Sequence, residues 1–79
     1  MHFVYAIQSD NDNRIYVGMS VDPEKRLQEH NQGKTKSTKG FLPWRIIYQE
    51  SLNSRSEARA REKYFKSGVG KEFLKSLVP

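Results

Sequence analysis

The sequence predicts an α+β fold: a three-stranded antiparallel sheet flanked by helices, in the order β-β-α-β-α-α. Three short segments are rich in aromatic and β-branched residues, which favour strands; they cover residues 2–8, 14–18 and 44–50. Helix-start signals stand at Asp22, before the third segment, and at Ser54, after it. We expect the helices to pack on one face of the sheet, as a two-layer sandwich.

The first two strands are predicted to form a hairpin. Residues 9–13 are five turn formers in a row, and Asp and Asn tolerate the backbone conformations of tight turns. Closing this loop places Ile7 opposite Tyr16 and Tyr5 opposite Gly18, so that both tyrosines lie on one face. A glycine at a strand end lets another group approach the backbone. Taken alone, the two tyrosines are more typical of strand aromatics that fill a small core than of a functional site.

The first helix is predicted from its two ends. Asp22 caps the free backbone N–H groups, and Pro23 suits the first helical position because its missing N–H is not needed there. The helix is expected to continue through Asn31 and to stop at Gly33, a typical C-terminal signal. Residues 34–43 are expected to form a loop, since they are mostly small, polar or basic.

The second helix begins with a capping box, in which Ser54 bonds forward and Glu57 reaches back. This helix is expected to end near Ser67 and Gly68. Residues 70–77 are predicted to form a short final helix.

The composition excludes several classes of protein. A chain of 79 residues without cysteine is expected to be one domain over residues 1–79, without a disulfide framework or a thiolate metal site. This composition fits a reducing cytoplasm. No segment approaches the roughly 18 apolar residues of a membrane span, and the N-terminus lacks the pattern of a signal peptide.

The positive charge is unevenly distributed. The 14 Lys and Arg residues outnumber the 9 Asp and Glu residues, and 11 of the 14 lie after residue 33, with only 4 acidic residues. This asymmetry indicates an electropositive face and a polyanionic partner. On composition alone, nucleic-acid binding and the basic character of many small soluble proteins are equally consistent with it. Six basic residues of the loop and the second helix are expected to hold a nucleic-acid backbone without reading its sequence: Lys34, Lys36, Lys39, Arg59, Arg61 and Lys66.

Arg26 and His30 are four positions apart on the first helix and therefore share a face. Leu27 is the one clear apolar anchor of that helix. We expect the Arg26 and His30 side chains beside the buried stripe, at the edge of whatever the helix packs on. An exposed pair without a function is the simpler interpretation of these two residues alone.

Glu62 is predicted to face inward. On the helical period it shares a stripe with Ala58 and Phe65. A carboxylate in that position is costly unless it is paired or bound to a cation. A salt bridge to a neighbouring arginine such as Arg26 and a metal-ligand role are equally consistent with the sequence.

Together these side chains are typical of an enzyme that cleaves phosphodiester bonds. Arg26 would neutralise phosphate charge. Glu62 would hold one divalent cation, with water filling most of the coordination shell, as Mg²⁺ prefers. A tyrosine hydroxyl near that cation would lose its proton more easily and act as a base.

At this point the chain resembles the GIY-YIG endonuclease superfamily, and in particular its small stand-alone bacterial branch. The resemblance covers residues 3 to about 75 and rests on several motifs in order. These are a degenerate first motif, Val4-Tyr5-Ala6; the second motif, Tyr16-Val17-Gly18; Arg26-Leu27-x-x-His30-Asn31; Pro43-Trp44; and Ala58-x-x-Arg61-Glu62-x-x-x-Lys66-Ser67-Gly68.

The resemblance implies hydrolysis of DNA with one divalent ion, Mg²⁺ or Mn²⁺, and a repair or recombination role. It implies that Tyr16 is the general base or activates the water, and that Tyr5 orients the nucleophile or the phosphate. By the same resemblance Arg26 clamps the phosphate, His30 supports Tyr16 or relays a proton, and Glu62 binds the metal. Structure-selective or weakly sequence-specific cutting is expected, with a homodimer or a targeting partner protein as possible additions.

The alternative is a nucleic-acid-binding module that keeps the nuclease fold without useful catalysis. The degenerate first motif favours this alternative. So does the stretch 71–75, which has no Asn where larger members of the superfamily carry one. A small module that binds only another protein has no positive feature in the sequence.

Overall fold

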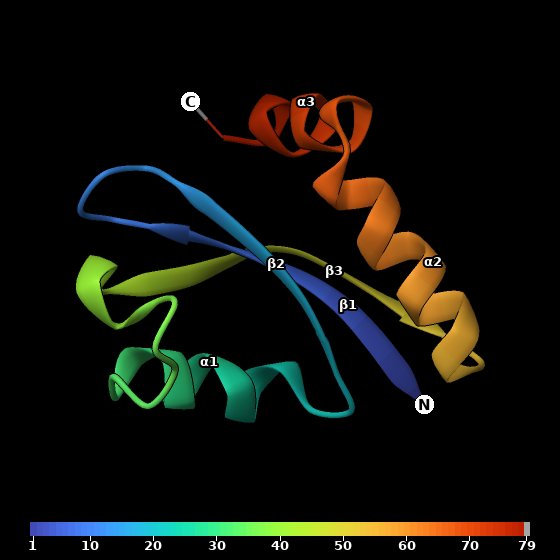
Figure 1. The fold of residues 1–79 in the computed structure, drawn as a ribbon, viewed down its shortest axis with the longest axis horizontal. Helices are drawn as coiled ribbons and strands as arrows, with labels where there is room; N and C mark the ends of the chain where they lie inside the picture. The colour runs from blue at the N-terminus through green and yellow to red at the C-terminus, as the bar shows by residue number, and fades with distance from the viewer. Residues whose placement is uncertain (79) are drawn as a thin grey trace.

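The computed structural model describes residues 1–78 and has the predicted order of strands and helices (Figure 1). Within residues 1–78, one element was not indicated by the sequence: a short 3₁₀ turn, η1, inside the predicted loop. The elements are β1 (His2–Ser9), β2 (Ile15–Ser20), α1 (Pro23–Asn31), η1 (Lys39–Phe41), β3 (Trp44–Leu52), α2 (Arg55–Lys66) and α3 (Gly68–Ser76).

The sheet is antiparallel, with the strand order β2-β1-β3, so that β1 lies in the middle. The predicted register of the hairpin is confirmed: Ile7 pairs with Tyr16, and Tyr5 pairs with Gly18. Because side chains alternate along a strand, Tyr5 and Ile7 point to one face of the sheet, and their neighbours on β1 point to the other.

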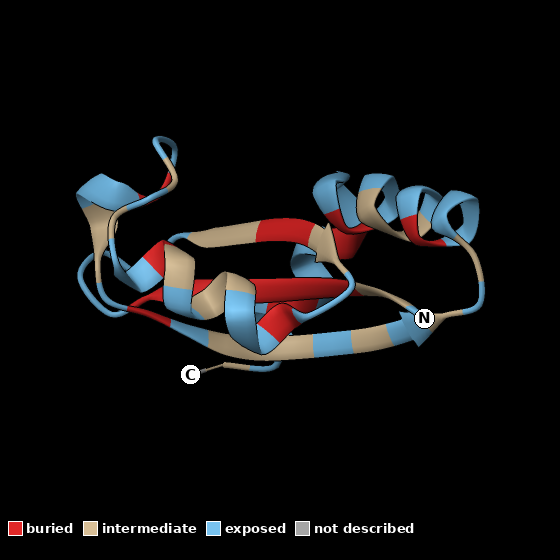
Figure 2. Ribbon diagram, turned by 90° about the horizontal axis from the view of Figure 1, so that it is seen from below, coloured by how far each residue is buried: buried red, intermediate tan, exposed pale blue. Residues whose placement is uncertain are grey.

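The expectation that all helices lie on one face of the sheet is wrong. Val4 and Ala6 pack with residues of α2 and α3 in one apolar cluster, whereas Tyr5 and Ile7 pack with Leu27 of α1 in another. The helices therefore lie on both sides of the strands, as Figures 1 and 2 show, and the fold has three layers. The physical reason is that a central strand has two faces to cover, and the middle of β1 is buried on both.

The helix ends follow the predicted signals. The Asp22 side chain accepts a hydrogen bond from the backbone N–H of Lys25, and Ser54 accepts one from Glu57. The final helix begins at Gly68, two residues earlier than expected. At the corner between α2 and α3 a Cβ on Gly70 would overlap the Tyr64 backbone, so the close contact of the two helices requires glycine. Among the described residues, no helix has the length and apolar character to cross a membrane.

Candidate active site

Tyr5 lies at the centre of the candidate site. It is 1% exposed, and its hydroxyl is 2.9 Å from Nε2 of His30. The ring of Tyr5 extends over Gly18 of β2, where a Cβ would stand only 2.7 Å from the Tyr5 hydroxyl oxygen. The missing side chain of Gly18 therefore makes the room that Tyr5 occupies, as the sequence suggested for a glycine at this position.

His30 was expected at the edge of the contact between the helix and the sheet, but it lies in the interior. It is completely buried, and Pro23, Leu27 and His30 follow the helical spacing of the face of α1 that packs on the sheet. Its hydrogen bond goes to Tyr5, whereas its contact with Tyr16 is a ring-edge contact at 5.1 Å between centroids. His30 therefore supports Tyr5 through a hydrogen bond and Tyr16 through packing of the two rings.

Tyr16 lies on the same face of the sheet as Tyr5, but its hydroxyl has a different environment. Among residues 1–78 this hydroxyl makes no hydrogen bond, and no buried side-chain nitrogen or oxygen lacks a partner. It follows that the hydroxyl of Tyr16 is accessible to solvent. The buried tyrosine is thus held by the protein, while the accessible one is open to a water molecule or a ligand.

Arg26 is half-exposed, and its guanidinium is fixed by an ion pair with Glu29, 2.6 Å away on the same helix. The same guanidinium lies near enough to the Tyr5 hydroxyl to lower the pKa of Tyr5. Arg26 therefore lies between a carboxylate that orients it and a tyrosine whose deprotonated form it would stabilise.

The pKa values of Tyr5 and His30 move in opposite directions for the same main reason. Burial raises the pKa of Tyr5 and outweighs the lowering effect of Arg26, and Tyr16 and Glu62 add smaller raising effects. Burial lowers the pKa of His30, and the nearby Arg26 charge acts in the same direction. Both shifts favour a neutral phenol beside a neutral imidazole at rest.

Glu62 lies on α2, with a side chain that is 18% exposed. Its stripe partners Ala58 and Phe65 are buried, which confirms the predicted stripe. Of the two alternatives for Glu62, the salt bridge is present, but its partner is Lys66, at 3.4 Å one turn along the same helix, and not an arginine such as Arg26. The carboxylate thus has one side against the protein and one side at the surface.

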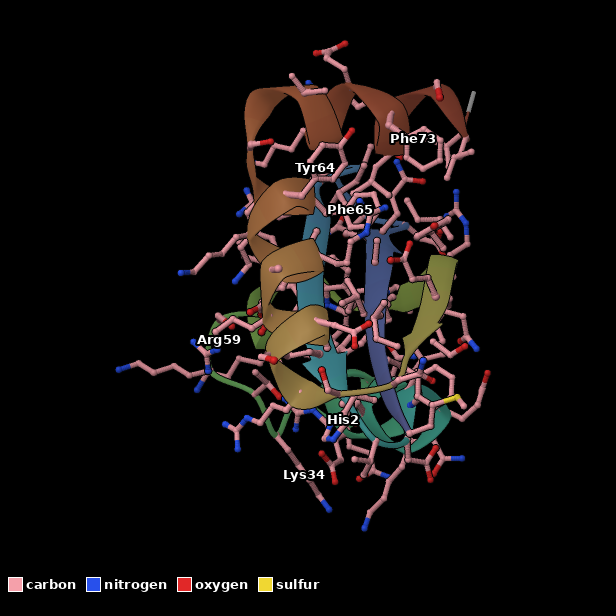
Figure 3. The ribbon with its side chains drawn as sticks, turned by 90° about the vertical axis from the view of Figure 1, so that its right-hand side faces the viewer. His2, Lys34, Arg59, Tyr64, Phe65 and Phe73 are labelled. Carbon is pink, nitrogen blue, oxygen red and sulfur yellow. The ribbon has the colours of Figure 1, made fainter. Side chains whose placement is uncertain are left out.

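A groove of about 450 Å³ runs beside Glu62 along the end of β2. Sequence reasoning singled out Arg59 and Glu62 from its lining but missed the others. The signal available for Arg55 was its helical spacing to Arg59 and Glu62, since positions four and seven apart share a face; His2 gave no signal. Figure 3 shows His2 and Arg59 in the lower half of the view onto α2. The lining residues are His2, Met19, Ser20, Val21, Arg55, Arg59 and Glu62.

The residues predicted to contact nucleic acid fall into two groups. Lys34, Lys36 and Lys39 are exposed around the loop after α1, and Arg59 is exposed on α2. Arg61, by contrast, donates two hydrogen bonds to Glu50 of β3, at 2.6 and 3.2 Å. Its guanidinium also lies over the rings of Tyr64 and Phe65. These contacts give Arg61 a structural role that joins α2 to the sheet.

The groove offers a divalent ion one carboxylate, that of Glu62. Among residues 1–78, no three His, Cys, Asp or Glu side chains gather as a metal cluster. Glu62 supplies a single carboxylate that already attracts the Lys66 ammonium, and Ser20 adds a hydroxyl to the lining. One or two carboxylates with water and substrate phosphates around them are the usual protein environment of Mg²⁺.

The buried His30 predicts that stability falls on mild acidification. Its pKa is lower in the folded than in the unfolded chain, so the unfolded chain binds more protons below its usual pKa of about 6.5. The stabilisation is complete above that pH and is lost as the pH falls from about 6.5 through the folded-state pKa. The groups that act on His30 are Arg26, which lowers its pKa, and Glu29, which raises it, with Tyr5 and Tyr16 in contact.

Denaturant unfolding between pH 5 and 8 measures this dependence. The variant His30→Gln is expected to show a weaker dependence of stability on pH in this range, because it lacks the buried imidazole. His2 is present in both proteins and does not contribute to the difference between them. Glu29 and Glu50 have lowered pKa values and act at more acidic pH. Equal slopes for the two proteins would contradict the assignment of His30.

Comparison with known proteins assigns this fold to one class of protein. A model of the GIY-YIG catalytic domain matches residues 1–74. The chain belongs to the GIY-YIG family, which is a family of nucleases.

Similar proteins occur in bacteria and archaea. A UPF0213 protein of Staphylococcus haemolyticus is 38% identical over 77 residues, which cover 96% of this chain and 93% of that protein. A UPF0213 protein of Halobacterium salinarum is 41% identical over 63 residues, which cover 78% of this chain and 80% of that protein. The solution NMR structure of a UPF0213 protein from Bacillus halodurans is 34% identical, with a TM-score of 0.57 over 96% of this chain and 83% of that one.

Proposed function

We propose that residues 1–79 form one nuclease domain that hydrolyses phosphodiester bonds in DNA with one bound Mg²⁺ or Mn²⁺. The observation that carries this proposal is the environment of the Tyr5 hydroxyl. Tyr16 of β2, Arg26 of α1 and Glu62 of α2 all influence the pKa of this hydroxyl. These groups come from segments far apart in the sequence, and they are the side chains that phosphodiester hydrolysis requires.

Each side chain has a separate task in the proposed reaction. Tyr16 acts as a phenolate, after its accessible hydroxyl has released its proton to solvent. Its oxygen orients the attacking water and takes up the proton that the water loses as it bonds to phosphorus and the bond to the leaving oxygen of the strand breaks. Arg26, held in place by Glu29, binds the phosphate and neutralises the negative charge that grows on it. Tyr5, fixed by His30, holds the phosphate or the water on the other side.

Glu62 is the residue that would hold the metal ion, with water and phosphate oxygens as the remaining ligands. When bound, the ion supplies positive charge to the phosphate and lowers the pKa of its bound water. The exposed side of the Glu62 carboxylate faces the groove, where such an ion would meet a DNA strand.

The DNA strand is proposed to follow the groove and the basic loop. Arg55 and Arg59 line the groove next to Glu62, and the exposed lysines lie around the loop after α1. Contacts of this kind hold the phosphate backbone and do not distinguish bases. We therefore propose cutting that depends on DNA structure, or only weakly on sequence, as suits a repair or recombination step.

A nicking assay tests the proposal directly. The full chain is incubated with supercoiled plasmid and with branched DNA, in Mg²⁺, in Mn²⁺ and in excess chelator. Metal-dependent nicks are expected, and chelator is expected to prevent them. Salt-dependent binding without cleavage in either metal would overturn the nuclease proposal in favour of the binding module.

The need for a second copy or a partner is tested in the same assay. A domain that acts alone gives an initial rate proportional to its concentration. A homodimer that forms during the titration gives a steeper dependence, and a missing targeting partner is indicated by activity that appears only when cell extract is added. We propose the first behaviour, because Tyr16, Arg26 and Glu62 all come from one chain.

The variant Tyr16→Phe is expected to reduce the cleavage rate by about 10²- to 10⁴-fold, the usual contribution of general base catalysis. The ring contacts with His30 and Trp44 remain, so the fold is preserved. The matched control is Tyr64→Phe, which removes the hydroxyl of a tyrosine that is 39% exposed on α2. Similar cleavage rates for the two variants would contradict a role for Tyr16 in catalysis.

A further inference from the structure

Thr38 is a fully buried residue within the loop that carries the exposed lysines. Its hydroxyl oxygen is 2.8 Å from Nδ1 of His30. The same hydroxyl donates a hydrogen bond to the backbone carbonyl of Thr35, at 3.3 Å. A polar side chain from a surface loop therefore reaches the far side of the histidine that holds Tyr5.

The position of Thr38 is fixed independently of His30. Its backbone carbonyl accepts a hydrogen bond from the indole N–H of Trp44, at 2.9 Å, and another from the backbone N–H of Phe41, at 3.1 Å. Its backbone N–H donates to Thr35. Because these contacts hold the residue from both sides, the hydroxyl of Thr38 is a stationary partner and not a mobile one.

The number of available protons decides the direction of each bond. A threonine hydroxyl has one proton and two acceptor sites. Since that proton goes to the Thr35 carbonyl, the hydroxyl of Thr38 accepts from Nδ1–H of His30. A neutral imidazole has one N–H, so Nε2 then carries a lone pair and accepts the hydroxyl proton of Tyr5.

We propose that Thr38 is a positioning residue that fixes the tautomer of His30 and makes its Nε2 the proton acceptor for Tyr5. For catalysis this inference rests on the proposed function, whereas the tautomer itself does not. The opposite tautomer would place N–H against the Tyr5 hydroxyl and leave Tyr5 without a proton acceptor. Thr38 thereby determines whether the hydroxyl of Tyr5 presents a lone pair or a proton on the side that faces away from His30.

The consequence for the site is a defined orientation of Tyr5. With its proton directed to His30, the oxygen of Tyr5 has its lone pairs free for Arg26. Transfer of that proton would break the O–H bond of Tyr5 and form an N–H bond at Nε2, which gives a phenolate and an imidazolium. Burial disfavours both charged forms, so the proton stays on Tyr5 at rest.

Nitrogen-15 NMR of histidine-labelled full chain at pH 8 tests the tautomer without any variant. The expected result is a His30 with protonated Nδ1 and unprotonated Nε2. Protonated Nε2 in the wild-type protein would overturn the inference. His2 lies in a different environment and serves as an internal reference in the same spectrum.

Two variants test whether Thr38 is the cause. Thr38→Val keeps the shape but removes the acceptor, so Nδ1–H would be left unsatisfied and the tautomer is expected to move toward Nε2–H. Thr38→Ser keeps the hydroxyl and is expected to retain the wild-type tautomer. Unchanged spectra in Thr38→Val would overturn the inference, and Thr35→Val is the control for a threonine change in the same loop.

Cleavage gives the second readout. Thr38→Val is expected to lower the cleavage rate by about tenfold or more at unchanged DNA affinity, and Thr38→Ser is expected to restore it. If Thr38→Val does not fold, the wild-type spectrum and Thr38→Ser decide. If the wild type shows the expected tautomer but no cleavage, the proposed function fails and the tautomer assignment stands. If it cleaves DNA with the opposite tautomer, the tautomer assignment fails and the proposed function stands.

Discussion

Replacement of Glu62 by Gln is expected to reduce DNA cleavage by more than about 10³-fold, because the neutral amide removes the charge that holds the metal ion. DNA binding is expected to stay the same or to tighten slightly, since one negative charge leaves the groove. Nicking of supercoiled plasmid measures the first effect, and a salt titration of DNA affinity measures the second.

The matched control is Glu72→Gln on α3. Glu72 is highly exposed and pairs only distantly with Lys75, at 3.8 Å, so this variant should cleave like the wild type. Loss of the Glu62–Lys66 pair costs little stability, because Lys66 is more than half exposed. Equal unfolding midpoints for the two variants would confirm this, and cleavage by Glu62→Gln at the wild-type rate would remove the metal-ligand assignment.

Mn²⁺ broadening gives a readout for Glu62 that does not depend on activity. In an NMR titration the amide signals around the groove should broaden in the wild type and remain sharp in Glu62→Gln. Broadening centred on another carboxylate would move the metal site there, whatever the cleavage assay shows.

The hairpin could be predicted from the sequence because its geometry is local. Residues 9–13 determine where the chain turns, and the turn then determines that Tyr5 lies opposite Gly18. The caps at Asp22 and Ser54 are local in the same sense, since each bonds to a backbone group three residues away. Interactions that depend on a few adjacent residues are the ones that a single sequence reveals.

The partners of His30 could not be predicted because they come from distant segments. Tyr5 is 25 residues away and Thr38 is 8 residues away across an irregular loop. The helix around His30 has one strong apolar residue, Leu27, and its polar pattern indicated a surface position. Both ring nitrogens have a hydrogen-bond partner, which offsets the cost of burying this histidine. These partners are visible only in the three-dimensional structure.

The role of Arg61 was hidden for a similar reason. Charge counting treats every arginine of α2 alike, yet Arg61 pairs with Glu50 on a different element, at 2.6 Å. Arg59, two positions earlier, lines the groove instead. Positions two apart point to different sides of a helix, so only the placement of α2 on the sheet separates a structural arginine from one available to DNA.

Replacement of Gly18 by Ala on β2 is expected to displace Tyr5 on the neighbouring strand β1. The new Cβ would lie 2.7 Å from the hydroxyl oxygen of Tyr5 and 2.9 Å from its Cζ. The ring cannot move away freely, because it is buried and its hydroxyl is bonded to His30. We expect a loss of about 1–3 kcal/mol in the free energy of unfolding and, with Tyr5 displaced from His30 and Arg26, a loss of cleavage of about 10²-fold.

The control is Gly40→Ala, since a Cβ on Gly40 has no atom within 4 Å and should change neither stability nor cleavage. The double variant Gly18→Ala with Tyr5→Phe separates the two effects. Removing the hydroxyl relieves the shortest contact, so the double variant should be more stable than the sum of the single changes predicts. Its cleavage should remain low, because the hydrogen bond to His30 is absent. Strict additivity of the two stability losses would show that the ring of Tyr5 does not lie against Gly18.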